Sequence, residues 1–144
     1  MLLTTDQAQF LEAWAGPTPP QLATSDNVRR GEVISAMLMF SGCTANQAGK
    51  CELRADYLIS APDGSVYGDS KDVKVWDEAP APGHNIQLSQ SNLSIQIEPG
   101  EQLGRYRIRI ALTDKVAGTR LEVSDEFTAL EAEPPSRVRG APQN

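Results

Sequence analysis

The sequence predicts an all-β fold, built as a two-sheet sandwich of antiparallel strands. The main observation is residues 103–130, where apolar and polar side chains alternate, pass through a turn at 115–118 and alternate again. The apolar row is Tyr106, Ile108, Ile110 and Leu112, with Leu121, Val123 and Phe127 on the return. A hairpin with one apolar face cannot bury that face alone, so a second sheet has to cover it. Further short runs separated by turn residues supply the strands of that sheet.

The first half of the chain contributes two clear strands. Residues 9–14 form either one helical turn or a first strand, and the prolines of 16–20 end that element. Residues 32–40 are apolar at nearly every position, which favours a strand covered on one face and partly shielded on the other. Residues 52–59 alternate strictly, as expected for a strand with one wet face.

The second half adds shorter strands separated by turns rich in proline and glycine. The turn at 61–65 contains Pro-Asp-Gly, which favours a hairpin. The short runs with strand character are 65–68, 73–76, 85–89 and 92–98. With the central hairpin this gives seven to eight antiparallel strands, the pattern of an immunoglobulin-like Greek-key sandwich. We expect this sandwich over 31–130, preceded by an N-terminal segment at 1–30 that packs on it or leads into it, and followed by a flexible tail at 131–144.

Length and charge limit the functions that the chain can serve. The 144 residues fit one domain, and the formal charge of -6 argues against nucleic acid as a general partner. No apolar run is long enough to span a membrane, so we expect no membrane insertion. Polar residues follow Met1 to Leu3 at once, so no signal peptide is present as given, and the protein is either cytoplasmic or has lost its leader.

The two cysteines favour export. Cys43 and Cys51 lie eight positions apart in a polar loop between two apolar runs, a suitable place for a disulfide. The alternative is a pair of free thiols. A disulfide implies an oxidising compartment, so we expect a periplasmic or secreted protein. Two cysteines and the single His84 do not make a tetrahedral site, and we expect no metal and no cofactor.

Several turn, core and cysteine motifs resemble a group of small bacterial periplasmic proteins of uncharacterised function with an immunoglobulin-like β-sandwich. The motifs are Phe-Ser-Gly-Cys at 40–43, Cys51, Pro-Asp-Gly-Ser-Val-Tyr at 62–67, Ile-Glu-Pro at 97–99 and Leu-Gly-Arg-Tyr at 103–106. The resemblance covers roughly residues 30–128, and it implies export to the periplasm. That family offers no catalytic residues. Gly104 and Tyr106 are also similar to the tyrosine corner of immunoglobulin-like domains, in which the phenol bonds back to the preceding loop.

Two surface features are candidate interfaces. Arg105, Arg107 and Arg109 share the polar face of the central hairpin, where they form either a solvated ladder with acidic neighbours or a recognition face for an acidic partner. Trp76 ends a short strand, where it either covers the core or anchors a partner.

The sequence does not indicate an enzyme. It contains no nucleophile elbow and no phosphate loop, and His84 offers a single base in a loop. We expect a non-catalytic extracytoplasmic binding or adaptor domain of the bacterial envelope, whose partner is another envelope protein or an anionic polymer. One alternative is a structural component that assembles through an exposed strand edge. Another is a periplasmic hydrolase or a carbohydrate-active accessory domain.

Overall fold

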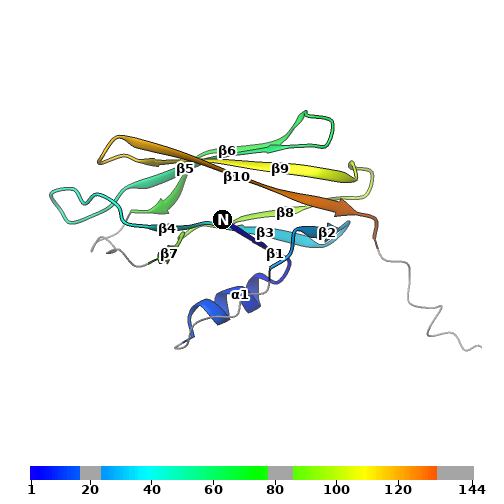
Figure 1. The fold of residues 1–144 in the computed structure, drawn as a ribbon, viewed down its shortest axis with the longest axis horizontal. Coiled ribbons are helices and arrows are strands. Elements are labelled where there is room, and N and C mark those ends of the chain that lie inside the picture. Colours follow the sequence, from blue (N-terminus) through cyan, green and yellow to red (C-terminus); the bar gives the residue numbers. More distant parts are fainter. Residues whose placement is uncertain (17–23, 78–85, 133–144) are drawn as a thin grey trace, which may run out of the picture.

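The computed structural model describes residues 1–16, 24–77 and 86–132, and within them it contains ten β-strands and one α-helix (Figure 1). In chain order the elements are β1 (Leu2–Thr4), α1 (Gln7–Trp14), β2 (Asn27–Arg29), β3 (Val33–Met37), β4 (Met39–Ser41), β5 (Leu53–Ser60), β6 (Val66–Trp76), β7 (Ile86–Leu88), β8 (Leu93–Gln96), β9 (Gly104–Asp114) and β10 (Thr119–Leu130). The proline-rich connection and His84 fall in 78–85, outside the described residues, as does the predicted tail from 133 onward.

The strands form one large sheet and two small ones. The large sheet has the order β2-β10-β9-β5-β6, and the small sheets are β1-β3-β8 and β4-β7. All neighbouring strands are antiparallel except β2 and β10, which pair in parallel. Figure 1 shows β5, β6, β9 and β10 stacked over β3, β4, β7 and β8, with α1 on the far side of the lower layer. The core lies between these layers.

The predicted immunoglobulin-like, all-β sandwich of seven to eight antiparallel strands is wrong. The described residues contain a helix, three separate sheets and a mixed five-stranded sheet with a parallel edge. Strands β1 and β2 were missed because three residues are too few to show alternation. Both come from the first thirty residues and are hydrogen-bonded into the sheets. The predicted domain boundaries at residues 30 and 130 stay predictions.

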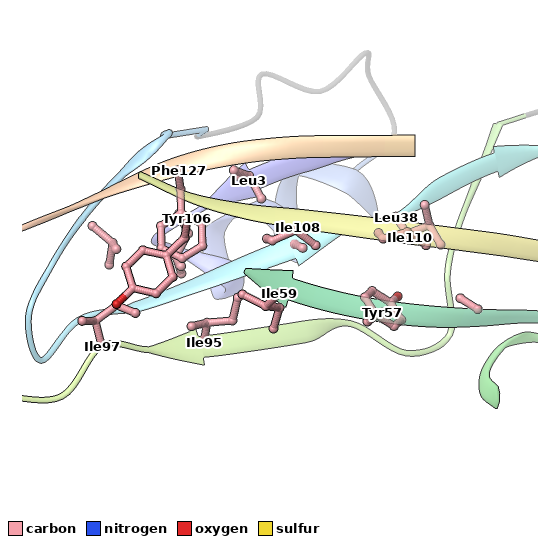
Figure 2. Packing of buried hydrophobic residues seen from close by; sticks show 14 of the residues in the cluster. Leu3, Leu38, Tyr57, Ile59, Ile95, Ile97, Tyr106, Ile108, Ile110 and Phe127 are labelled. Atoms are coloured by element: carbon pink, nitrogen blue, oxygen red, sulfur yellow. The ribbon is translucent and has the colours of Figure 1, made fainter. Parts of the chain in front are cut away.

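The central hairpin forms as its alternation predicts. Strands β9 and β10 pair in regular antiparallel register from Thr119 opposite Asp114 to Ala129 opposite Gly104. Tyr106 and Phe127 face each other in this register and are 0% and 1% exposed. Their rings stack with centroids 5.1 Å apart, and Figure 2 shows them at one end of the cluster of buried side chains. This hairpin therefore supplies a large part of the apolar surface that the fold buries.

Helix α1 covers the outer face of β3. The Asp6 carboxylate accepts a hydrogen bond from the Gln9 amide (3.0 Å) and so caps the first turn. Phe10 is completely buried, and the Ser35 hydroxyl on β3 donates to Gln7 Oε1 (3.0 Å). Met37, which alternates onto the same face of β3 as Ser35, is also fully buried, and burial of both faces accounts for the nearly continuous apolar run of the strand.

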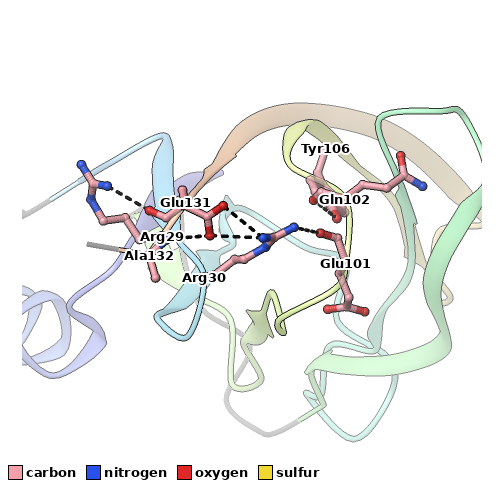
Figure 3. Close-up of polar contacts among 7 residues, drawn as sticks. All are labelled: Arg29, Arg30, Glu101, Gln102, Tyr106, Glu131 and Ala132. Carbon is pink, nitrogen blue, oxygen red and sulfur yellow. Dashed lines mark hydrogen bonds and ion pairs between the residues drawn. The ribbon is translucent and has the colours of Figure 1, made fainter. Parts of the chain in front are cut away.

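The loop that enters β9 is held from two sides (Figure 3). The Tyr106 hydroxyl donates to the carbonyl oxygen of Gln102 (2.7 Å), so the phenol bonds back to the preceding loop as predicted. The Arg30 guanidinium donates to the carbonyl oxygen of Glu101 and forms an ion pair with Glu131 (Nη1 to Oε1, 3.1 Å). Arg30, from the turn between β2 and β3, and Glu131, just after β10, therefore meet at this loop.

Three tyrosines are held in their neutral form by the fold. Burial, followed by a hydrogen bond to Glu101, raises the pKa of Tyr67, whose hydroxyl donates to Glu101 Oε1 (2.8 Å) and to the Gln96 carbonyl oxygen (3.2 Å). Burial also raises the pKa of Tyr57 and of Tyr106. An unfolded tyrosine ionises near pH 10, so the unfolded state loses its protons first as the pH rises.

We therefore expect the free energy of unfolding to be insensitive to these tyrosines below about pH 10 and to fall above it. Urea denaturation at about pH 8, 10 and 11 measures this change. In the Tyr67→Phe variant, part of the alkaline loss should disappear because one of the raised groups is gone. A Tyr67→Phe profile with the same alkaline slope as the parent would contradict the assignment.

Candidate ligand-binding cleft

A disulfide joins Cys43 and Cys51 in the loop between β4 and β5. Cys51 is 1% exposed. The flanks of the loop contact the β9–β10 turn, because the Thr44 amide donates to Asp114 Oδ2 (3.0 Å) and the Lys115 amide donates to the Glu52 carbonyl oxygen (2.9 Å). The disulfide therefore closes a loop that is fastened to the tip of the central hairpin.

The predicted arginine row lies on the outer face of β9 and shares one acidic partner. Arg107 Nη2 lies 3.0 Å from Glu126 Oε2, and Arg105 Nη1 lies 3.6 Å from Glu126 Oε1. Glu126 stands opposite Arg107 in the strand register. Arg109, on the same strand, forms no ion pair with any described residue. The row thus has the geometry of a solvated cross-strand ladder, and its use as an interface stays a prediction.

Trp76 does not join that row. Its indole packs edge-to-face on Phe40 with ring centroids 5.8 Å apart, and the side chain is partly buried against the core. The ring therefore covers the core from the end of β6, whereas the arginines point from the outer face of β9. The four predicted interface residues do not form one surface.

An opening lies between the layers, at the end that carries the disulfide loop. It is a cleft of about 570 Å³ between β4 and the tip of the β9–β10 hairpin. Its apolar floor and walls are formed by Leu38, Phe40, Leu53, Leu112, Leu121 and Val123. Apolar clefts of this size are typical binding sites for small ligands or for side chains of a partner.

The walls of the cleft end in two exposed apolar side chains. Leu121 belongs to the core-facing row of β10, the same row as the buried Phe127, yet it is 62% exposed. Ile86 on β7 is 65% exposed and lines the same cleft. The alternation of the sequence places Leu121 on the inner side of the sheet. The local sequence does not show whether another layer covers it.

Polar groups at the cleft are engaged in the structure around it. Asp114 Oδ1 accepts hydrogen bonds from the Val116 and Ala117 amides (both 3.1 Å), in addition to the bond from Thr44. Arg120 lies 4.0 Å from both Asp56 and Glu122. Within the described residues, no group of three histidine, cysteine or acidic side chains is placed to hold a metal ion. The cleft is therefore suited to hold an apolar group between polar rims.

In the described ranges, no helix is both long and apolar enough to cross a bilayer. Helix α1 has only eight residues.

Comparison with known proteins gives matches by structure and none by sequence. No protein-family model and no curated protein match the sequence. One solved structure that aligns with the chain is the Pseudomonas fluorescens alkylpurine DNA glycosylase AlkC bound to DNA containing an abasic site analog. The two are 17% identical with a TM-score of 0.46, and the alignment covers 73% of this chain and 27% of that chain. The chain thus spans about a quarter of that protein.

Two predictions from the sequence are corrected at this point. The expected binding or adaptor domain of the bacterial envelope, with its structural and hydrolase alternatives, is not supported by any of these comparisons. The exclusion of nucleic acid is corrected as well. The exclusion was drawn from the net charge of -6, which describes the whole chain and does not fix the charge of a single face. The resemblance to uncharacterised periplasmic proteins stays a prediction.

Proposed function

We propose that the protein binds a ligand by taking an apolar group into the cleft between β4 and the tip of the β9–β10 hairpin. The observation that carries this proposal is the 62% exposure of Leu121 on the core-facing side of β10. Full burial of an apolar side chain of this size contributes about 1.5–3 kcal/mol of free energy relative to full exposure. A ligand that covers Leu121 and Ile86 gains this free energy on binding.

The chemistry of the cleft supports an apolar ligand over a reactive one. Its floor is formed by Leu38 and Phe40, which are buried to 3% and 8% exposure and are fixed by the core around them. The acidic group on its rim, Asp114, accepts hydrogen bonds from three backbone amides, which hold it in the β9–β10 turn. These features of the cleft support a binding role. We also propose that the chain is not an enzyme.

The test uses a fluorescent apolar probe, anilinonaphthalene sulfonate, titrated against the folded protein. We expect saturable binding that weakens about tenfold in Leu121→Asp, because the new carboxylate would have to be desolvated under the probe. The fold should persist, since Leu121 is exposed. Val66→Asp is the matched control, because Val66 is 64% exposed on β6 and does not line the cleft. Equal probe affinity in Leu121→Asp and the parent would refute the proposal.

We also propose that the protein works in an oxidising compartment, either periplasmic or extracellular. The Cys43–Cys51 disulfide supports this, because reducing compartments keep such thiols apart. Alkylation of the protein from its host, without reductant, followed by intact mass measurement tests the proposal. Two unreactive cysteines are expected, and two alkylated cysteines would place the protein in a reducing compartment.

A further inference from the structure

We infer that the ligand is an extended peptide segment with alternating apolar and basic residues, which adds as a strand to the free edge of β10 beside the cleft. This inference rests on the proposed function, because the apolar side chains of the segment are the groups that would fill the cleft. Strand addition to an open sheet edge is a recurring mode of peptide recognition, in which main-chain hydrogen bonds give affinity and pockets select side chains.

The edge is open along the half of β10 that borders the cleft. Strand β2 pairs with β10 only at Thr128, Ala129 and Leu130. Within the described residues, no strand pairs with that edge of β10 between Thr119 and Glu126. This position, which no described strand fills, continues the line of β2, so the sheet geometry for a further strand is already present.

Within residues 1–16, 24–77 and 86–132, backbone groups of this edge have no hydrogen-bond partner. The Thr128 amide donates to the Asp26 carbonyl oxygen (2.8 Å), and the Leu130 carbonyl accepts from the Arg30 amide (2.9 Å), so these peptide groups face the β2 side. Alternate residues of an antiparallel strand face the same neighbour, and the β9–β10 register is unbroken. The peptide groups of Arg120, Glu122 and Ser124 therefore point to the vacant position.

One residue sets the length of the free edge. The Glu126 amide belongs to the same series, but it donates to the Asp125 carboxylate (2.8 Å). The side chain of Asp125 thus closes the edge where β2 begins. The stretch left open runs from Arg120 to Ser124, about 17 Å of strand at roughly 3.3 Å per residue, which is room for a short peptide and not for a long strand.

Side chains on the two faces of the edge specify the partner. Leu121 and Val123 point into the cleft, so the inward side chains of the incoming segment meet apolar surface. On the outer face, Glu122 is 75% exposed, and its one ion pair with a described residue is to Arg120 at 4.0 Å. A basic side chain on the incoming strand would form a cross-strand pair with Glu122.

The experiment measures the affinity of a short capped peptide of alternating lysine and valine, by calorimetry. Two isomers are compared, N-methylated on alternate residues in one register or in the other. In strand addition, only one set of amides faces β10, so one isomer should bind about tenfold more weakly than the other. Equal affinities of the two isomers would overturn strand addition.

Variants of the protein give a second readout. Ser124→Pro removes one edge amide and should weaken the unmethylated peptide about tenfold, while Ser124→Ala should leave its affinity unchanged. Glu122→Lys should weaken the lysine peptide and strengthen one of alternating glutamate and valine. Equal peptide affinity in Ser124→Pro and the parent would overturn the inference. So would a Glu122→Lys variant that keeps the parent's preference for the lysine peptide.

Hydrogen exchange distinguishes peptide binding at this edge from pairing of the edge with a second copy of the chain. The amides of Arg120, Glu122 and Ser124 should become protected when the peptide is added, and not when the protein alone is concentrated. Protection that depends on protein concentration would show a second copy on the edge and would overturn the inference. If the fluorescent probe binds through Leu121 while both peptide isomers bind alike, strand addition alone fails; if the probe does not bind, the cleft proposal fails first.

Discussion

Replacing Phe127 by Ala is expected to lower the free energy of unfolding by about 3–5 kcal/mol. Phe127 is 1% exposed and stacks on Tyr106 at 5.1 Å, while Tyr106 in turn packs edge-to-face on Tyr67, also at 5.1 Å. Removal of the ring therefore opens a cavity between aromatic side chains that have little room to collapse. Urea denaturation of the purified variant measures the loss.

The matched control is Leu121→Ala in the same strand and on the same side. Leu121 is 62% exposed, so this substitution should change the free energy of unfolding by no more than about 0.5 kcal/mol. If both substitutions lower the free energy of unfolding by the same amount, Leu121 is covered in solution and the cleft is closed. The pair of variants thus tests the core and the cleft together.

Replacing both Cys43 and Cys51 by Ala is expected to lower the free energy of unfolding by about 2.5 kcal/mol in the chain-entropy model of a disulfide. The crosslink joins residues eight positions apart, so the loop that it closes is short and the effect lies toward the low end for disulfides. The loop also holds the β9–β10 turn through Thr44 and Lys115. Thermal unfolding with and without reductant measures the effect.

Reduction gives the control for this prediction. The reduced parent protein should melt at the temperature of the double variant, and the double variant should not respond to reductant. A parent protein that melts at one temperature under both conditions would show that the disulfide does not contribute to stability.

The elements with long, regular alternation could be predicted from the sequence. The hairpin of β9 and β10 lies where the pattern at 103–130 places it, with Tyr106 and Phe127 inside and Arg107 outside. The alternation of β5 likewise matches its burial, from Leu53 to Ile59. In these strands, side-chain periodicity and burial report the same geometry, so the local sequence is sufficient to predict the strand and its buried face.

Short strands and their partners could not be predicted in this way. In β2, only Val28 is buried, and a single apolar residue has no period. Its parallel pairing with β10 is a contact between residues about one hundred positions apart. That long-range pairing, and the helix on β3, are what separate the observed fold from the predicted sandwich.

The cleft escaped prediction for a different reason. Leu121 and Phe127 occupy equivalent positions in one alternating row, yet one is exposed and the other is buried. The row determines the side of the sheet from which each side chain projects. Whether that side is covered depends on how far the opposite layer extends, which is a property of the assembled layers.

The pairing of β2 with β10 also has a consequence for the time course of folding. The partners of Asn27 and Val28 are Thr128 and Ala129, so this edge of the sheet cannot form on the ribosome until nearly the whole described chain has emerged. Contacts of such sequence separation are slow to form, with milliseconds to seconds typical for domains rich in them. During synthesis, the strand that follows α1 must wait unpaired while the hairpin that completes its sheet is still being made.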